Sequence, residues 1–273
     1  MRVSLDWEST YHYSDPVRLL HTELRVLPAD GFGQSLEAGS IQLTPPADPK
    51  PLQDMFGNAY HHVDFLEEID HITVAVQAEV ETSVPEVGDS GAADAVNPLL
   101  QHLYLAPSDR APLDPGIAAF NEAIPADLDP VATGHAFCEL ANQRFTFEVG
   151  STDVAATALD LIRLQRGVCQ DFSHLMLATL RQRGIPARYV SGYLAPSEGE
   201  QSSDASHAWV QLLAGERWHG FDPANHTVQD GRYVVTAVGR DYDDVPPIRG
   251  TFAGVASEEW RTNLRVRSNG RQQ

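Results

Sequence analysis

The sequence predicts an α+β fold, with a β-rich N-terminal domain followed by a core in which a cysteine-bearing helix packs on an antiparallel sheet. Apolar and polar residues alternate with period two through much of the first ~85 residues, as in strands with one buried face. Beyond residue 97 the apolar spacing becomes helical, and after residue 187 short strand patterns return. We therefore divide the chain into residues 1–96, 97–245 and 246–273, the last as a C-terminal tail.

The N-terminal domain is expected to contain several short antiparallel strands. The alternating patterns cover residues 3–7, 20–26, 60–65 and 72–80, of which the last is the most regular. The run Asp54 to Asn58 has turn chemistry and separates two of these strands. Short strands with such breaks are typical of a sandwich or a half-barrel.

The middle of the chain is expected to be helical. Residues 84–96, rich in small and polar residues, have the composition of a linker. The candidate helices are separated by proline-rich breaks, and they cover residues 98–103, 116–123, 131–142 and 153–165. In the last of these we expect Thr152 or Asp153 to cap the N-terminus.

A further helix is predicted from Cys169 to Arg183, since Gly184 suits a helix end and Pro186 prevents continuation. Strands are predicted at residues 187–194, 207–213 and 217–221, the last two joined by a short turn around Gly215. The polar segment 196–206 suits either a lid or an ordinary solvated loop. The tail contains one candidate returning strand, residues 263–266.

Composition excludes several classes of function. The net charge of −19 disfavours nucleic acid as a partner. No apolar run approaches the ~20 residues of a spanning helix, so no membrane partner is expected. The first residues lack an apolar signal stretch and the chain has only two cysteines, which predicts a cytoplasmic protein without a disulfide framework. Metal-ligand spacings such as CxxC are missing from the sequence, so we expect no metal or organic cofactor.

Three residues form a candidate catalytic set, namely Cys169, His207 and Asp222. A helix N-terminus and a nearby imidazolium both favour the thiolate form of a cysteine, and Cys169 is placed in the first helical turn. His207 and Asp222 lie at nearly equal distances from the turn at Gly215, so a hairpin brings them together. A thiol, an imidazole and an orienting carboxylate suffice for acyl transfer. Cys138, in an apolar stretch, is interpreted as a buried hydrophobic residue.

The motifs around these residues resemble those of the transglutaminase-like superfamily, and within it the bacterial proteins proposed to be cysteine proteases. The core motifs are GVCQDFSHL at 167–175, GIPARYVSGY at 184–193, HAW at 207–209 and FDP at 221–223. Residues 13–17, 24–28 and 54–58 resemble the N-terminal β-domain of that group, and residues 239–247 its post-core segment. The resemblance covers nearly the whole chain.

The resemblance implies a papain-like or transglutaminase-like core in which Cys169 attacks a carbonyl, His207 transfers the proton and Asp222 orients the imidazole. The spacings of 38 and 15 residues differ from papain itself, where the histidine follows ~130 residues after the cysteine and asparagine is the third member. The expected oxyanion donor is the Cys169 backbone N–H. Gln143 is a candidate for the second donor, with a solvated role as the alternative.

Several residues near the candidate catalytic set have a predicted role and an alternative. Tyr193 and Trp209 either line the cleft or fill the core. Asp171 complements the helix dipole and has to point away from the sulfur, because a carboxylate there opposes thiolate formation. His174 is interpreted as structural, and Asn225 as a turn residue with substrate contact as the alternative.

We therefore predict cysteine-dependent acyl transfer on a peptide or protein amide substrate. Hydrolysis of the kind performed by a thiol protease is favoured over crosslinking, because water is always available as the acceptor. The alternatives are a crosslinking transglutaminase, an amidase acting on a non-protein amide, and a non-catalytic scaffold module with this fold.

Overall fold

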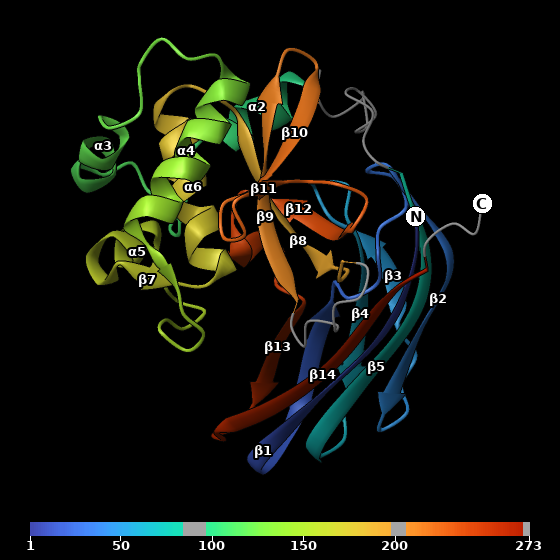
Figure 1. Cartoon of the computed structure of the whole chain (residues 1–273). Coiled ribbons are helices and arrows are strands. Elements are labelled where there is room, and N and C mark those ends of the chain that lie inside the picture. Colours follow the sequence, from blue (N-terminus) through green and yellow to red (C-terminus); the bar gives the residue numbers. More distant parts are fainter. Residues whose placement is uncertain (84–96, 198–205, 270–273) are drawn as a thin grey trace.

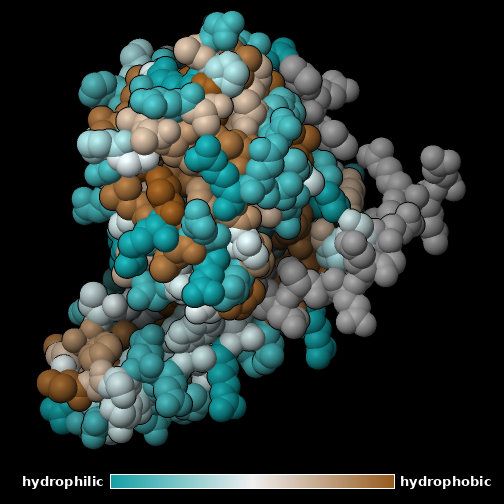
Figure 2. All heavy atoms as spheres, turned by 60° about the vertical axis from the view of Figure 1, so that its left-hand side comes forward, coloured by the Kyte–Doolittle hydropathy of each residue, from teal (hydrophilic) through white to brown (hydrophobic). Residues whose placement is uncertain are grey.

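The structure is a computed structural model that describes residues 1–83, 97–197 and 206–269. A large β-sheet and a mixed core of helices and strands lie against each other (Figure 1). Figure 2 shows the helix-covered side of the core, with the large sheet projecting below it. None of the described helices is long and apolar enough to span a membrane.

One long strand organises the large sheet. β1 (Arg2–Leu24) pairs over its first half with β5 (Ile69–Thr82) and β14 (Glu258–Asn269). Its second half pairs with β4 (Ala59–Phe65) and β13 (Ile248–Ala253). Because β13 and β14 join this sheet, residues 248–269 belong to the same layer as the strands within residues 2–82, which we call the β-layer.

Two shorter strands complete the sheet, β2 (Gln34–Thr44) beside β5 and β3 (Lys50–Gln53) beside β4. The strand expected at 3–7 and residues 20–24 of the strand expected at 20–26 prove to be parts of the single strand β1, and residues 25–26 lie beyond its end. A register shift against β5 between His12 and Val17 lets the strand change partners without ending. The buried residues Val3, Leu5 and Trp7 face the core side of this sheet.

Three of the helices begin where proline follows a capping residue. α2 (Pro98–Leu105), α3 (Pro115–Asn121) and α4 (Pro130–Arg144) each start with proline. The side chains of Asn97, Asp114 and Asp129 accept backbone N–H groups of these first turns.

The helix expected from residue 153 begins later, as α5 (Ala158–Leu164). Thr157, and neither Thr152 nor Asp153, is its N-cap. The carboxylate of Asp160 accepts the Thr157 backbone N–H at 2.9 Å, which completes a capping box. Asp153 instead accepts the N–H of Ala155 in a local turn, so the preceding apolar residues do not extend the helix.

The core sheet has the order β11-β10-β9-β8-β12. Its strands are β8 (Ala187–Leu194), β9 (His207–Ala214), β10 (Arg217–Asp222), β11 (Thr227–Val228) and β12 (Tyr233–Gly239). α6 (Cys169–Gln182) packs against β8 and β9, and every residue from Gln170 to Arg181 is buried. A parallel pair, β6 (Thr146–Phe147) with β7 (Arg166–Gly167), precedes α6, and the short helix η1 (Tyr242–Asp244) follows β12.

Two buried amide side chains join the β-layer to the core. Asn58 donates to the Val238 carbonyl at 2.7 Å and accepts the Val238 N–H at 2.8 Å. Gln34 makes the same pair of bonds with Val235, at 2.9 and 2.8 Å. Each side chain thus makes the pair of hydrogen bonds that a neighbouring strand would make. The backbone N–H and carbonyl groups of Val235 and Val238 therefore have partners.

Candidate active site

Cys169 is the first residue of α6, following an extended Val168 and the short strand β7. The first N–H groups of a helix lack acceptors inside the helix, and they carry its positive dipole end. Gly167 is required here because a Cβ atom at that position would lie 2.7 Å from the Asp171 carboxylate. The close packing of β7 against the first turn of α6 therefore fixes the position of the Cys169 thiol.

The carboxylate of Asp171 turns back toward the start of the helix. It is fully buried and accepts the Val168 N–H at 2.7 Å and the Thr152 hydroxyl at 2.6 Å. Burial raises the pKa of Asp171 above its ordinary value, while these two hydrogen bonds act in the opposite sense. Asp171 therefore caps the start of α6, and its carboxylate accepts hydrogen bonds from Val168 and Thr152.

His207 begins β9 and Asp222 ends β10, and their side chains meet at 2.6 Å between Nε2 and Oδ2. The two strands are paired in the register Val210 with Phe221. His207 and Asp222 are therefore diagonal neighbours on one face of the hairpin, within reach of each other's polar atoms.

Asp222 is fully buried and held by several donors. Its Oδ2 accepts from His207, from Asn225 Nδ2 at 2.8 Å and from the Tyr233 hydroxyl at 2.8 Å. Its Oδ1 accepts the backbone N–H groups of Ala224 and Asn225. Burial acts to raise the pKa of Asp222, but the hydrogen bond and charge of His207, with the Asn225 bonds, hold it below its ordinary value.

His207 is a strongly basic imidazole in this setting. Burial acts to lower its pKa, but side-chain hydrogen bonds to Asp222 and Cys169 outweigh burial and raise the pKa to about 10. Because Nε2 is occupied by Asp222, Nδ1 is the ring nitrogen left for the thiol. The arrangement can hold a proton on His207 beside the sulfur.

Two aromatic residues pack around the imidazole. Trp209 stacks on His207 with ring centroids 6.1 Å apart, is fully buried, and donates its indole N–H to Gln229 at 3.0 Å. Tyr233 lies 6.1 Å from the His207 ring. Tyr233 comes from β12, and no local sequence pattern pointed to it. Trp209 therefore packs against the buried side of the His207 imidazole.

The remaining candidates take different places. Gln143 is exposed near the end of α4, where its amide donates to Glu139 at 3.5 Å. Tyr193 is buried and its hydroxyl donates to the Val26 carbonyl at 2.8 Å, which links β8 to the β-layer. Cys138 is buried, and burial, together with the charge of Asp222, raises the pKa of its thiol to about 12. Asn225 serves both as a turn residue and as a donor to Asp222.

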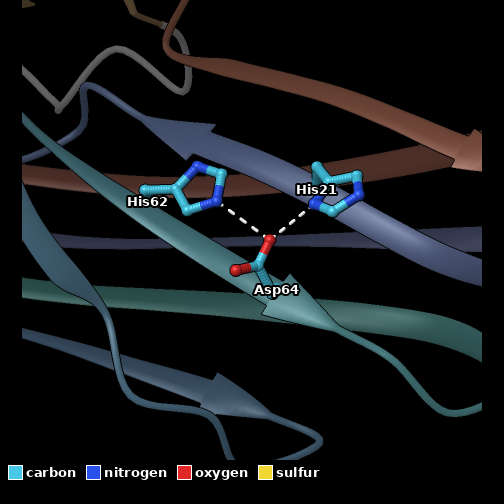
Figure 3. Close-up of side chains that lie close together, drawn as sticks. All are labelled: His21, His62 and Asp64. Atoms are coloured by element: carbon cyan, nitrogen blue, oxygen red, sulfur yellow. Dashed lines mark hydrogen bonds and ion pairs between the residues drawn. The ribbon is translucent and has the colours of Figure 1, made fainter.

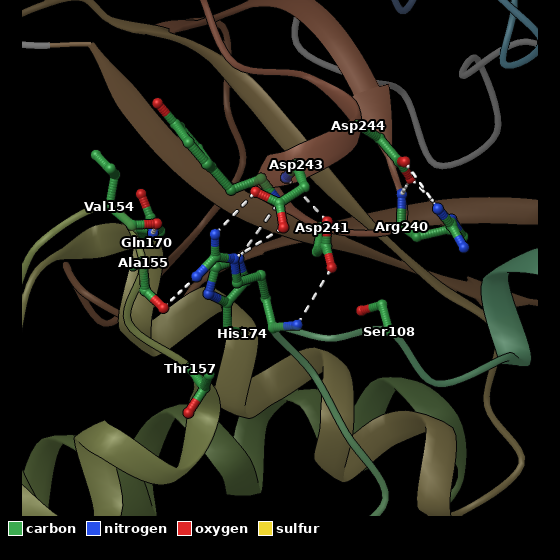
Figure 4. A network of polar contacts seen from close by, with 12 residues as sticks. Ser108, Val154, Ala155, Thr157, Gln170, His174, Arg240, Asp241, Asp243 and Asp244 are labelled. Atoms are coloured by element: carbon green, nitrogen blue, oxygen red, sulfur yellow. Dashed lines mark hydrogen bonds and ion pairs between the residues drawn. The ribbon is translucent and has the colours of Figure 1, made fainter. Parts of the chain in front are cut away.

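A second polar network ties α6 to the segment after β12 (Figure 4). His174 is fully buried, and its Nε2 accepts the Tyr242 N–H at 3.3 Å. Burial, with the nearby charges of Arg110 and Arg181, lowers the pKa of His174 to about 3, so it is neutral. Arg110 spans the network through two bonds to Asp243, at 2.9 and 3.1 Å. This network positions α6 and η1 relative to each other.

Three side chains with metal-ligating atoms gather elsewhere, on the outer face of the large sheet (Figure 3). His21 Nδ1 and His62 Nε2 lie 2.5 and 2.9 Å from the same Asp64 oxygen. Within the described residues this is the group of three whose ligand atoms could hold a metal ion. It comes from β1 and β4, whereas Cys169, His207 and Asp222 come from α6, β9 and β10.

Comparison with known proteins adds two family matches. Residues 3–81 match the model of the bacterial transglutaminase-like N-terminal region, and residues 119–223 match that of the transglutaminase-like superfamily. An uncharacterised protein of Mycobacterium leprae is 30% identical over 258 residues, covering 89% of this chain and 90% of that protein. One from Mycobacterium tuberculosis is 32% identical over 272 residues, covering 91% and 87%.

The fold also matches a solved structure. A proposed cysteine protease from Cytophaga hutchinsonii superposes with a TM-score of 0.79, covering 99% of this chain and 92% of that one. The two sequences are 21% identical, so the match bears on the fold alone.

Proposed function

Because this chain belongs to the transglutaminase-like superfamily, we propose that it is a cysteine-dependent enzyme that transfers the acyl group of a peptide or amide substrate to water. The observation that carries the proposal is the position of His207. Its side chain bonds to Asp222 on one side and to Cys169, at the start of α6, on the other.

In the first half-reaction the Cys169 sulfur attacks the substrate carbonyl carbon and the carbonyl oxygen takes the negative charge. The backbone N–H of Cys169, at the positive end of α6, is the donor we assign to that oxygen. His207 then gives its proton to the leaving amine as the C–N bond breaks, and a thioester remains on Cys169.

In the second half-reaction His207 removes a proton from water, which attacks the thioester and releases the acid. Asp222 keeps Nε2 of the imidazole engaged, so that Nδ1 faces the reacting atoms throughout. A primary amine in place of water would give a crosslink instead, which is the main alternative. A non-catalytic scaffold is the second, and the buried hydrogen bonds that converge on Asp222 favour catalysis over it.

The test is the rate of Cys169 alkylation by iodoacetamide at pH 6 and at pH 9. Cys138→Ser is introduced in every variant so that one thiol reports. We expect a rate at pH 6 close to that at pH 9, and a steep pH dependence in His207→Ala, because the imidazolium favours the thiolate. Equal pH dependence in both proteins would contradict an ion-paired nucleophile and would support the scaffold alternative.

We also propose that the protein acts in the cytoplasm, where a reducing environment keeps thiols free. Both cysteines are unpaired, and Cys169 must remain a thiol to react. Cell fractionation with an antibody to this chain would test this, and recovery mainly outside the cytoplasm would contradict it.

A further inference from the structure

A groove of about 480 Å³ lies between the large sheet and the core. One wall comes from β1 and β14 and includes Trp7, Tyr11 and Trp260. The other wall comes from the core and includes Gln170 and Ser206. The groove therefore runs between the large sheet and the core, along the start of β14.

Two residues that line the groove are sequence neighbours of the proposed catalytic residues. Gln170 directly follows Cys169, and Ser206 directly precedes His207. Gln170 is fixed in place, since its amide donates to the Val154 carbonyl at 3.1 Å and both residues line the groove. A chain segment lying in the groove would thus contact the residues next to Cys169 and His207 along the chain, on the side of the large sheet.

The β-layer contributes aromatic rings and one carboxylate to the lining of the groove. In the pairing of β1 with β14, Tyr11 lies opposite Trp260 and Tyr13 opposite Glu258. Glu258, Trp260 and Thr262 alternate along β14, so their side chains share the face that lines the groove. Trp260 remains 61% exposed, which leaves its indole ring free for contact.

Glu258 has no cationic partner among residues 1–83, 97–197 and 206–269. Partial burial raises the pKa of its carboxyl. Its charge also reaches Tyr11, where burial first and the charge of Glu258 after it raise the pKa to about 12. A carboxylate beside the exposed ring of Trp260 and the half-buried ring of Tyr11 is a combination that attracts a cation, through charge and through the ring faces.

Resting on the proposed function, we propose that this groove binds a positively charged side chain of the peptide substrate, lysine or arginine, with Glu258 as the specificity-determining residue. The aliphatic stem of such a side chain packs on Tyr11 and Trp260, and its charged end reaches Glu258. The net charge of −19 adds a long-range attraction for cationic peptides.

A second hollow of about 480 Å³ on the sheet does not share these properties. It is lined by charges of both signs, including Asp6, Glu79, Arg265 and Arg267. It also contains no residue from the core, whereas the groove does. Of these two hollows, the groove is the one that has a single charged residue, Glu258, and a lining residue next to Cys169.

The experiment measures binding separately from catalysis. Cys169→Ala protein is titrated calorimetrically with a blocked pentapeptide that has lysine at its centre, and with the same peptide carrying neutral norleucine. We expect the lysine peptide to bind about tenfold more tightly. Adding Glu258→Gln should remove that difference.

Glu259→Gln is the matched control, since Glu259 is the exposed neighbour on the opposite face of β14. It removes the same charge and should leave the lysine preference intact. Equal binding of the two peptides, no binding of either, or equal loss in both glutamine variants would overturn the inference.

The two proposals fail in different ways. A lysine preference that depends on Glu258, together with ordinary alkylation kinetics of Cys169, would remove the catalytic proposal and leave the binding site. The reverse result would keep the catalytic proposal and remove the cationic specificity.

Discussion

The Tyr233 hydroxyl lies 2.8 Å from Asp222 Oδ2, the same oxygen that His207 binds at 2.6 Å. The Tyr233 ring also lies 6.1 Å from the His207 ring, and its hydroxyl shares a hydrogen bond with Thr227 at 2.8 Å. One tyrosine from β12 thus fixes the carboxylate and packs on the imidazole, so Tyr233 is a positioning residue for the pair.

Tyr233→Phe should lower kcat about three- to tenfold with little change in KM, because it removes one hydrogen bond to Asp222 and keeps the ring. Steady-state kinetics on a peptide substrate measure the split. Thr227→Val is the comparison, since it removes the other partner of Tyr233 and leaves the bond to Asp222. A larger effect on KM than on kcat would contradict a positioning role.

Cys169→Ala should reduce turnover by at least about 10⁴-fold, since triad members act as a unit and the nucleophile cannot be replaced. Circular dichroism should show an unchanged fold, because the substitution is small. Cys138→Ser is the control for the loss of a thiol. Turnover retained in the Cys169 variant would end the proposed mechanism.

Asp171→Ala should destabilise the protein by about 1–2 kcal/mol, because it removes the acceptor of the Val168 N–H at the start of α6. Asp171→Asn keeps one acceptor oxygen and removes the buried charge, so its cost should be smaller. Urea unfolding at pH 7 compares the variants. Equal losses would show that the carboxylate charge, rather than the cap, stabilises the helix start.

Stability should fall as the pH drops from about 6.5 toward 3, in part because of His174. Its pKa is lowered from 6.5 to about 3 in the folded protein, so the unfolded chain binds more protons in that window. Free energies of unfolding for wild type and His174→Gln should therefore differ in slope between these pH values. A His174→Gln profile parallel to wild type would contradict a neutral buried imidazole.

Asn58→Ala should cost about 2–4 kcal/mol, because it leaves both the N–H and the carbonyl of Val238 without their partner. Chemical denaturation measures this loss. Asn225→Ala is the control in an exposed turn, where Asp222 Oδ2 keeps its bonds from His207 and Tyr233 and a smaller change is expected. A loss below that of Asn225→Ala would mean that β12 does not depend on the β-layer.

The sequence alone was sufficient where the determining interactions are local. A strand, a short turn at Gly215 and a second strand bring His207 and Asp222 together within one hairpin. Gly167 and the apolar pattern after Cys169 likewise place the cysteine at the start of α6. Such contacts span few residues, so residue spacing encodes them directly.

Competing local patterns were resolved only in the folded protein. The apolar residues near 155 suited a helix, but the capping box of Thr157 and Asp160 starts α5 later. The strand patterns at 3–7 and 20–26 proved to lie largely in one strand, β1, because β5 and β14 pair along its first half and β4 and β13 along its second.

Only the tertiary structure decided the contacts between distant segments. Tyr233 reaches Asp222 from another strand, Asn58 reaches Val238 across 180 residues, and Glu258 lies opposite Tyr13 through the pairing of the chain's two ends. Residue spacing carries no information on which distant edges will pair. That choice depends on how the whole set of buried faces packs and which backbone groups remain to be satisfied.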